Sequence, residues 1–422
     1  MNGRWFPRFL VLGIMAMLIV SAFSPSARAA AAGSYIVVLR DGVDARVVAR
    51  EHAAQHAANV AHVYSHALNG YAARIPVQAL AGIKADPRVR FVSVDAPMHL
   101  ATQTLPTGVN RIEADLSSTK AGNGSGSINV GVAIIDSGIY AHRDLNVAGG
   151  VNCMGSTGYS DGYGHGTHVA GIVGAKDDTN DVVGVAPGTP LYAVKVFDDT
   201  GNGTWSTIIC GIDWVTQNAA GLNIKVANMS ISGAGADDGN CGNTNNDALH
   251  KSICNSVAQG ITYVVAAGND TKDFAGAVPA AYKEVLTVTA VTDYDGMPGG
   301  KKSFGCQFFD KDDSGADYSS FTAVGSADAA HTIAAPGSCI LSTAKGGGTT
   351  TKSGTSMASP HVAGTVALCI GSGACSGLSP SGIIAKLRAD AAARPAAYGF
   401  KDDPNSPNGT RYYGYLVYAG GY

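Results

Sequence analysis

The chain has 422 residues, with 29 Lys and Arg against 32 Asp and Glu, so its formal net charge is only -3. This near-neutral balance, without a cluster of Lys or Arg, excludes the basic surface that nucleic-acid binding requires. Glycine is abundant at 55 residues but shows no repeat or collagen period, and we attribute it to tight turns in a compact domain.

Residues 1–29 have the pattern of a secretory signal peptide. Arg4 and Arg8 form a basic start, residues 10–23 an apolar core, and Ala27-Arg28-Ala29 an A-x-A cleavage site. The core is shorter than the ~20 residues of a membrane span, and an uncleaved anchor is the alternative. The sequence therefore predicts a secreted, extracellular protein without stable membrane association.

Residues 30–101 are predicted to form a small, separate α+β unit. Its expected elements are strands at 35–39, 67–75 and 89–94 and helices at 43–60 and 77–85. A unit of this size with few large apolar side chains buries little core, so it is expected to be marginally stable by itself.

Apolar strand-like runs alternate with helical stretches through residues 102–422. The expected strands are 130–135, 191–197, 224–231, 261–266 and 285–291, and the expected helices are 165–175, 205–218, 247–259 and 355–370. Continuous apolar strands between helices predict an α/β fold, with a mainly parallel sheet covered by helices on both faces. In such a sheet, functional sites gather at the carboxyl ends of the strands.

Three segments supply an acid, a base and a nucleophile. Asp136 ends the apolar run in VAIIDSG, His165 begins HGTHVAG, and Ser356 lies in GTSMASP. A serine hydroxyl attacks only when a neutral imidazole takes its proton, and a carboxylate must hold that imidazole in one tautomer. Taken singly, Asp136 also fits a polar strand end, His165 with His168 a packed or metal-binding pair, and Ser356 a turn.

The order Asp, His, Ser, together with a fourth segment, resembles the subtilisin-like serine proteases, the subtilases. In VAAGN, Asn269 looks like the family residue whose side-chain amide stabilises the oxyanion. The resemblance implies a subtilisin-like fold and a serine endopeptidase in which Asp136, His165, Ser356 and Asn269 are catalytic.

The segments YIVVL, LNGYAA and PRV in residues 30–101 resemble the inhibitory propeptide of subtilases, which also acts as a folding chaperone. An ordinary accessory domain is the alternative. The resemblance implies a proenzyme that removes this unit itself, with 102–422 as the catalytic domain. It places the cut after Ala101, which puts Ala101 at P1 and Met98 at P4.

The resemblance also assigns substrate-binding residues on two edges of the cleft. Ser232 stands where the family usually has glycine on the S1 wall, and Ala277 where the pocket floor is often glycine, so a shallow pocket is expected. Trp205 is expected over the S4 pocket, although a packing role at a helix start is the alternative. The assigned residues are Ser230, Ile231, Ser232, Gly233, Gly201, Gly203, Trp205 and Ala277.

Structural Ca²⁺ is the cofactor that the resemblance implies. The acidic loop 176–182 is similar to the family's calcium loop, although a merely solvated loop is the alternative. The insert Asp310-Lys311-Asp312-Asp313 is a weaker candidate for a second site. The expected ligands of the first site are the side chains of Gln103, Asp144 and Asp178 and the backbone carbonyls of Lys176, Asn180 and Val182.

All eight cysteines follow residue 150, and export to an oxidising compartment makes disulfides their expected use. A zinc site is the competing interpretation, but the sequence has no CxxC pair. Eight cysteines allow 105 pairings, so pairing in chain order is a preference only. It joins Cys153 to Cys210, Cys241 to Cys254, Cys306 to Cys339, and Cys369 to Cys375.

These patterns together predict a secreted, monomeric serine endopeptidase that acts on protein and peptide substrates and is inhibited by its own propeptide. A catalytically inactive relative that binds partners or calcium is the alternative, and the intact triad with Asn269 argues against it. An α/β-hydrolase would need a G-x-S-x-G elbow and a serine that precedes the acid and the base, and neither occurs.

Overall fold

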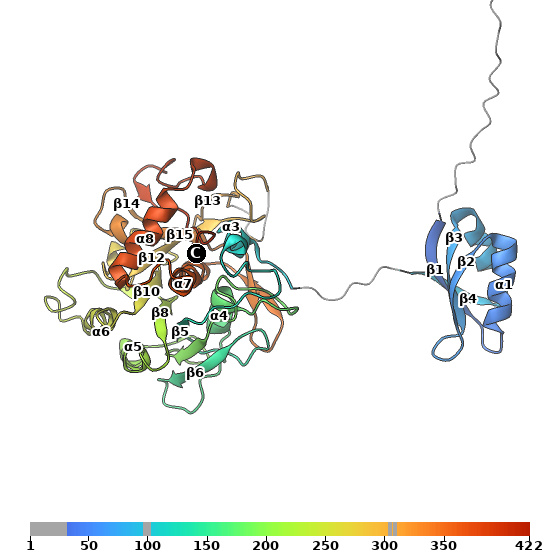
Figure 1. Ribbon diagram of the computed structural model, residues 1–422, viewed down its shortest axis with the longest axis horizontal. Helices are drawn as coiled ribbons and strands as arrows, with labels where there is room; N and C mark the ends of the chain where they lie inside the picture. Colours follow the sequence, from blue (N-terminus) through green and yellow to red (C-terminus); the bar gives the residue numbers. More distant parts are fainter. Residues whose placement is uncertain (1–31, 96–102, 303–305, 307–309) are drawn as a thin grey trace, which may run out of the picture. The chain divides into compact units, whose positions relative to one another are not determined.

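The computed structural model describes residues 32–95, 103–302, 306 and 310–422. The chain divides into two compact units, residues 1–100 and 101–422. In Figure 1 the small unit is blue, and the large unit runs from cyan to red. The predicted signal peptide and the predicted cut after Ala101 lie outside the described residues.

The small unit is a four-stranded antiparallel sheet in the order β2-β3-β1-β4, packed against two helices. The prediction of one helix over 43–60 was wrong at its end: Ala57 takes a left-handed conformation (φ 51°), and the chain continues as a strand. The elements are β1 (Ala32–Leu39), α1 (Ala45–His56), β2 (Asn59–Tyr64), β3 (Gly70–Pro76), α2 (Leu80–Ala85) and β4 (Val89–Val94).

The large unit is built on an eight-stranded sheet in the order β13-β12-β10-β8-β5-β7-β6, with β15 beside β12. Every pair is parallel except β12 with β13, which confirms the predicted mainly parallel α/β fold. The strands are β5 (Gly131–Asp136), β6 (Val147–Asn152), β7 (Leu191–Lys195), β8 (Ile224–Met229), β10 (Thr262–Ala266), β12 (Leu286–Thr292), β13 (Ser314–Gly315) and β15 (Thr332–Pro336).

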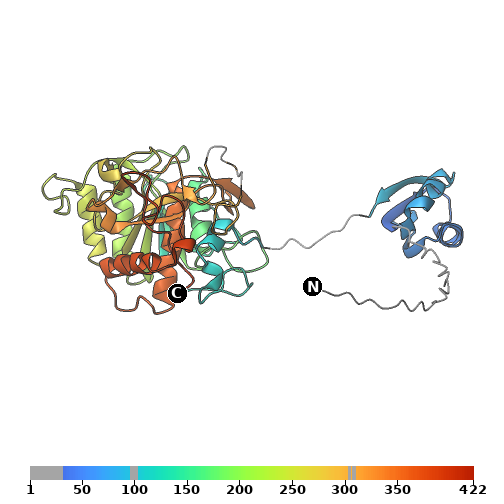
Figure 2. The same cartoon turned by 90° about the horizontal axis from the view of Figure 1, so that it is seen from above.

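Helices cover both faces of this sheet (Figure 2). On one face α4 (His165–Gly174), α7 (Thr355–Gly371) and α8 (Pro380–Ala392) bury residues such as Val173 and Val366. On the other face α5 (Trp205–Asn218) and α6 (Ala248–Val257) bury Ile212 and Ile253. Because α7 is buried on nearly every side, it has no polar face.

Short elements complete the large unit, and four disulfides join its loops and helices. The bonds are Cys153–Cys210, Cys241–Cys254, Cys306–Cys339 and Cys369–Cys375, the same pairs as in the chain-order scheme. Among the described residues, no helix combines the length and the apolarity needed to cross a bilayer. The short elements are α3 (Thr107–Arg111), β9 (Gly233–Ala234), β11 (Ala277–Val278), β14 (Thr322–Ala323), β16 (Ile340–Thr343), β17 (Thr349–Lys352) and β18 (Arg411–Tyr412).

Candidate active site

Asp136 and His165 form a direct pair at the carboxyl end of β5. Asp136 is the last residue of this fully buried strand, and its two carboxylate oxygens lie 2.8 and 2.9 Å from Nδ1 of His165. The backbone N–H of Ser137 also donates to Asp136, at 2.7 Å. His165 is the first residue of α4, preceded by Gly164 at φ 97°, a conformation that favours glycine.

This pairing fixes which ring nitrogen of His165 carries the proton. In the neutral ring the proton sits on Nδ1, where it donates to Asp136, so Nε2 is left as the base. Burial by itself lowers the pKa of His165, but the charge and the hydrogen bond of Asp136 outweigh it, and the pKa lies above its ordinary value. His165 can therefore accept a proton readily from a neighbouring hydroxyl.

Asp161 is a buried carboxylate that sequence reasoning missed. It accepts hydrogen bonds from the backbone N–H groups of Gly164 and Thr167 at 2.6 and 2.8 Å, and from the hydroxyl of Ser137 at 2.9 Å. These bonds tie the start of α4 to the loop after β5, which fixes the separation of His165 from the strand end. An aspartate four residues before the histidine is the only sequence signal for this role.

Ser356 is the second residue of α7, and Gly354 before the helix has a φ of 151°. Its hydroxyl donates to the carbonyl oxygen of Ser230 at 3.3 Å, while the hydroxyl of Ser230 donates to the carbonyl oxygen of Ser356 at 2.9 Å. Ser230 lines the same cavity as Asp136 and His165, so the structure brings all three expected triad residues to one site. In ligand-free proteins the catalytic hydrogen bonds are often long or directed elsewhere.

Asn269 lies just beyond the end of β10 and is oriented by a residue that sequence reasoning did not single out. Its Oδ1 accepts from both the backbone N–H and the hydroxyl of Thr355, at 2.9 and 3.0 Å. The Thr355 hydroxyl in turn accepts from the N–H of Gly268 at 3.1 Å. With Oδ1 held in this way, Nδ2 is the part of the amide that remains available as a donor beside Gly354.

Two neighbouring cavities are lined by residues that the sequence analysis assigned to substrate binding. One, of about 230 Å³, is bordered by Asp136 and His165, by Gly201 and by the segment Ser230-Ile231-Ser232. The other, of about 340 Å³, is bordered by Gly203, Trp205, Ile231, Ser232 and Gly233. Tyr163 and Phe197, which the sequence did not single out, complete these walls.

Trp205 and Ala277 differ in how they relate to these cavities. The ring of Trp205 is 42% exposed and lies over Gly233, where an added Cβ would come within 2.6 Å of it. It is therefore a wall residue rather than a core residue. Ala277 borders neither cavity directly, because it belongs to β11, where it pairs with Ala234 of β9 behind the wall.

Several expected calcium ligands converge. The side-chain amide of Gln103 donates to the carbonyl oxygens of Lys176 and Val182 at 2.6 and 3.1 Å. Asp144 accepts from the N–H of Val182 with one oxygen, and its other oxygen is buried without a hydrogen-bond partner among the described residues. Burial and the charges of nearby aspartates raise the pKa of Asp144 to about 6. A buried, bare carboxylate oxygen beside carbonyl oxygens fits a hard cation such as Ca²⁺.

The remaining residues of the calcium loop are arranged differently. The side chain of Asp178 accepts from the backbone and side-chain N–H groups of Asn180, at 2.6 and 3.0 Å, and so faces its own loop. Asp181, which the sequence analysis did not name, lies with His142 and Asp144 in a group whose ligand atoms are all within 4.8 Å.

The insert named as the second candidate calcium site contributes one carboxylate to an acidic group. Of the insert 310–313, Asp313 pairs with the buried Arg111 at 2.9 Å, and Asp312 accepts from the N–H groups of Tyr294 and Lys302. The group that the structure gathers instead is Asp293, Asp295 and Asp312. The sequence could not show this, because the chain folds back to bring distant carboxylates together.

A parallel α/β domain with a paired aspartate and histidine at one strand end, and a serine at a helix start that is hydrogen-bonded to a residue of the same cavity, defines a serine hydrolase. The model of the family described as the Subtilase family matches residues 127–414, and that described as Peptidase inhibitor I9 matches residues 34–101. The chain belongs to the subtilase family. It is a serine endopeptidase with an I9-type propeptide.

Curated relatives and solved structures agree with this assignment. Subtilisin NAT of Bacillus subtilis subsp. natto is 38% identical over 309 residues, which are 72% of this chain and 71% of that protein. Subtilisin DY of Bacillus licheniformis is 40% identical over 274 residues, 64% of this chain and 85% of that protein. A solved cold adapted subtilisin-like serine proteinase has a TM-score of 0.55 and 28% identity, and covers 74% of this chain and 97% of that chain.

Proposed function

We propose that the chain is a secreted, self-processing proenzyme whose large unit cleaves proteins through an acyl-enzyme on Ser356. The observation that carries the proposal is the bond of His165 Nδ1 to both oxygens of Asp136, at 2.8 and 2.9 Å, in a cavity that is also lined by Ser230, the hydrogen-bond partner of Ser356. This bond leaves Nε2 as the only basic atom of the ring.

In the proposed reaction, Oγ of Ser356 attacks the carbonyl carbon of the substrate while Nε2 of His165 takes its proton. Asp136 stabilises the imidazolium that forms. His165 then gives the proton to the leaving amine, and the peptide C–N bond breaks to leave an ester on Ser356. Water, deprotonated by His165, hydrolyses this ester and restores the enzyme.

The oxyanion formed at each step is assigned to Nδ2 of Asn269 and the backbone N–H of Ser356. The two bonds from Thr355 to Oδ1 of Asn269 support this role, because they hold the amide with its donor side free. A donor fixed before the reaction stabilises the developing charge without reorganisation, typically by about 10² to 10³ in turnover.

The maturation site supports a preference for small apolar residues at P1. A site cut by the enzyme itself must fit its own pockets, and the proposed cut places Ala101 at P1 and Met98 at P4. The Ser232 wall agrees with a small P1, and the Trp205 ring over Gly233 agrees with an apolar P4. One methylene is worth only about 1 to 3 kcal/mol in such a pocket, so a broad preference is expected.

Ca²⁺ is proposed as a structural cofactor held by Gln103, Asp144 and the loop 176–182. Bound there, it would supply a positive charge that stabilises the buried carboxylate of Asp144 and the facing carbonyl oxygens. The site shares no residue with the triad. We further propose an extracellular monomer with no nucleic-acid partner, since the net charge of the chain is near zero.

Labelling with a serine-directed phosphonate tests the proposed nucleophile. The secreted wild-type protein and the exposed-site control Ser381→Ala should each take up one label per chain, while Ser356→Ala should take up none. Amino-terminal sequencing of the mature wild type should begin within a few residues of Thr102. Labelling of Ser356→Ala would contradict the assignment.

A further inference from the structure

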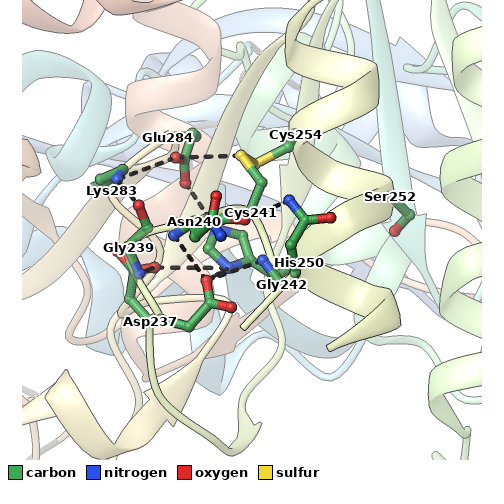
Figure 3. The surroundings of a disulfide bond; sticks show 12 residues. Asp237, Gly239, Asn240, Cys241, Gly242, His250, Ser252, Cys254, Lys283 and Glu284 are labelled. Atoms are coloured by element: carbon green, nitrogen blue, oxygen red, sulfur yellow. Dashed lines mark hydrogen bonds and ion pairs between the residues drawn. A yellow bond between two sulfur atoms is a disulfide. The ribbon is translucent and has the colours of Figure 1, made fainter. Parts of the chain in front are cut away.

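A buried histidine outside the active site lies between the two segments that follow the paired strands β9 and β11. β9 and β11 pair with each other, with Gly233 opposite Val278. The chain after β9 enters the loop 235–247, and the chain after β11 runs through residues 279–285 to β12. His250, on α6, contacts both of these segments (Figure 3). Its side chain is fully buried.

Each part of the His250 ring has a different contact. Nε2 lies 2.8 Å from Oε2 of Glu284, in the segment after β11. Nδ1 faces Oδ1 of Asp237 at 3.6 Å and Oδ1 of Asp238 at 3.4 Å, both in the loop after β9. The ring stacks on Tyr282, with the ring centroids 4.0 Å apart and an interplanar angle of 4°.

Further contacts join the residues around His250 to one another. The Cys241–Cys254 disulfide joins the loop to α6, and Sγ of Cys241 lies 3.7 Å from Oε1 of Glu284 (Figure 3). Lys283 lies 4.0 Å from Glu284 and donates to the carbonyl oxygen of Gly239 at 2.6 Å. The hydroxyl of Tyr282 donates to Asp247, the N-cap of α6, at 2.6 Å. The titratable groups around His250 are therefore Asp237, Asp238, Asp247, Tyr282, Lys283 and Glu284.

The two ring nitrogens face carboxylates on opposite sides. Nε2 is hydrogen-bonded to Glu284, whereas Nδ1 has no hydrogen-bond partner among the described residues and faces Asp237 and Asp238 at ion-pair distance. A neutral imidazole has one N–H and one lone pair, so one nitrogen would turn a lone pair toward Glu284 or toward the two aspartates. Only the imidazolium presents an N–H to both sides. Burial lowers the pKa of His250, but the hydrogen bond and charge of Glu284 and the charges of the two aspartates outweigh it, so the pKa is raised.

We infer that His250, as an imidazolium, is a positioning residue for the P1 pocket, because its hydrogen bond to Glu284 and its positive charge beside Asp237 and Asp238 hold the segments after β9 and β11 together. The inference rests on the proposed placement of that pocket at Ser232, directly before β9, with β11 paired to β9 behind this wall. When the proton leaves, three carboxylates face a neutral ring, the two segments separate, and the pocket admits larger side chains.

The direction of the pH dependence follows from the raised pKa of His250. The stabilisation is complete below the ordinary histidine pKa of about 6.5, and it is lost as the pH rises through the folded-state value. Selectivity for a small P1 residue should therefore be greatest in mildly acidic solution.

The test is the pH dependence of P1 selectivity in the mature enzyme. We would measure kcat/KM from about pH 5 to about pH 9 for two peptides that differ only in Ala or Phe at P1. Their ratio cancels the titration of His165, which both reactions share. The Ala-to-Phe ratio of the wild type should fall by roughly three- to tenfold as the pH rises.

Three variants give the comparison. His250→Gln should show a ratio that is independent of pH and equal to the high-pH value of the wild type. Lys251→Gln removes one positive charge from the next, exposed position of α6 and should keep the wild-type profile. Glu284→Gln retains a polar group near Nε2 but no longer stabilises the imidazolium, so the midpoint of its profile should move to lower pH.

A wild-type ratio that stays constant over this range would overturn the inference and leave the protease proposal standing. So would an unchanged profile in His250→Gln or, if that variant does not fold, an unmoved midpoint in Glu284→Gln. Failure of the wild type to hydrolyse either peptide would contradict the proposed function, and the inference with it.

Discussion

The two units of this chain are stabilised in different ways. The small unit has one modest apolar cluster on a four-stranded sheet, in which alanine is frequent, and it contains no cysteine. The large unit has apolar clusters on both faces of an eight-stranded sheet and four disulfides. The difference agrees with the proposal that the small unit is removed and that the large unit remains as the mature enzyme.

A network of polar side chains also stabilises the small unit, whose apolar core is small. The side chain of His52 is buried between the hydroxyl of Tyr71, at 2.5 Å from Nδ1, and Asp86, at 3.0 Å from Nε2. Arg88 joins Asp86 to Glu51 at the surface. Arg88 lowers the pKa of Asp86 through these hydrogen bonds, so this part of the network is lost only in strong acid.

Ser356→Ala should have the largest effect, because it removes the nucleophile that is proposed to separate the two units. Activity should fall by roughly 10⁴-fold or more. The chain should accumulate uncut at about 390 residues, which is the 422-residue sequence less the 29 residues of the predicted signal peptide. Mass spectrometry of the product checks this, with Ser381→Ala as the control. A normally processed chain from a host without other proteases would refute self-processing.

Removing disulfides should destabilise the large unit in proportion to the loop that each one closes. In the Ser356→Ala background, replacing Cys153 and Cys210 with serine opens a loop of sequence separation 57 and should cost about 4 kcal/mol of unfolding free energy. Replacing Cys369 and Cys375, with a separation of 6, should cost about 2 kcal/mol. Denaturant unfolding measures both, and equal costs would contradict the chain-entropy account.

Chelation of calcium should also act on the large unit alone. A cation that binds only the folded domain stabilises it by about 2.7 kcal/mol when its free concentration is roughly 100 times Kd. A chelator should therefore lower the melting temperature of the large unit before it lowers the initial rate. Asp144→Asn should abolish this sensitivity, and the exposed Asp213→Asn should retain it. An immediate loss of turnover with unchanged heat resistance would mean that the site is misassigned.

Tyr71→Phe should have the smallest effect, and it should be confined to the small unit. The variant leaves Nδ1 of the buried His52 without its partner, which costs about 1 to 3 kcal/mol. In the Ser356→Ala background, thermal unfolding should show an earlier transition for the small unit and an unchanged one for the large unit. The control is Tyr64→Phe, at the end of β2. A shift in the second transition would show that the two units unfold together.

The sequence by itself determined the fold class, and it singled out the residues that the structure brings together at the candidate site. Their signals are local: an apolar run that ends in Asp136, and glycines that allow a positive φ directly before His165 and before the helix that carries Ser356. Helix α5 spans 205–218 as predicted, because its apolar positions repeat at helical spacing and Thr204 caps it. Such patterns depend only on neighbours along the chain.

Only the tertiary structure decided which residues distant in the sequence contact one another around the candidate site and elsewhere in the large unit. Thr355 and Asn269 are 86 positions apart, and His250 and Glu284 are 34 apart, yet each pair is joined by a hydrogen bond. The same holds for the regrouping of Asp312 with Asp293 and Asp295. These contacts form because packing against the sheet buries polar groups that must then find partners, and the choice of partner depends on the whole fold rather than on spacing in the sequence.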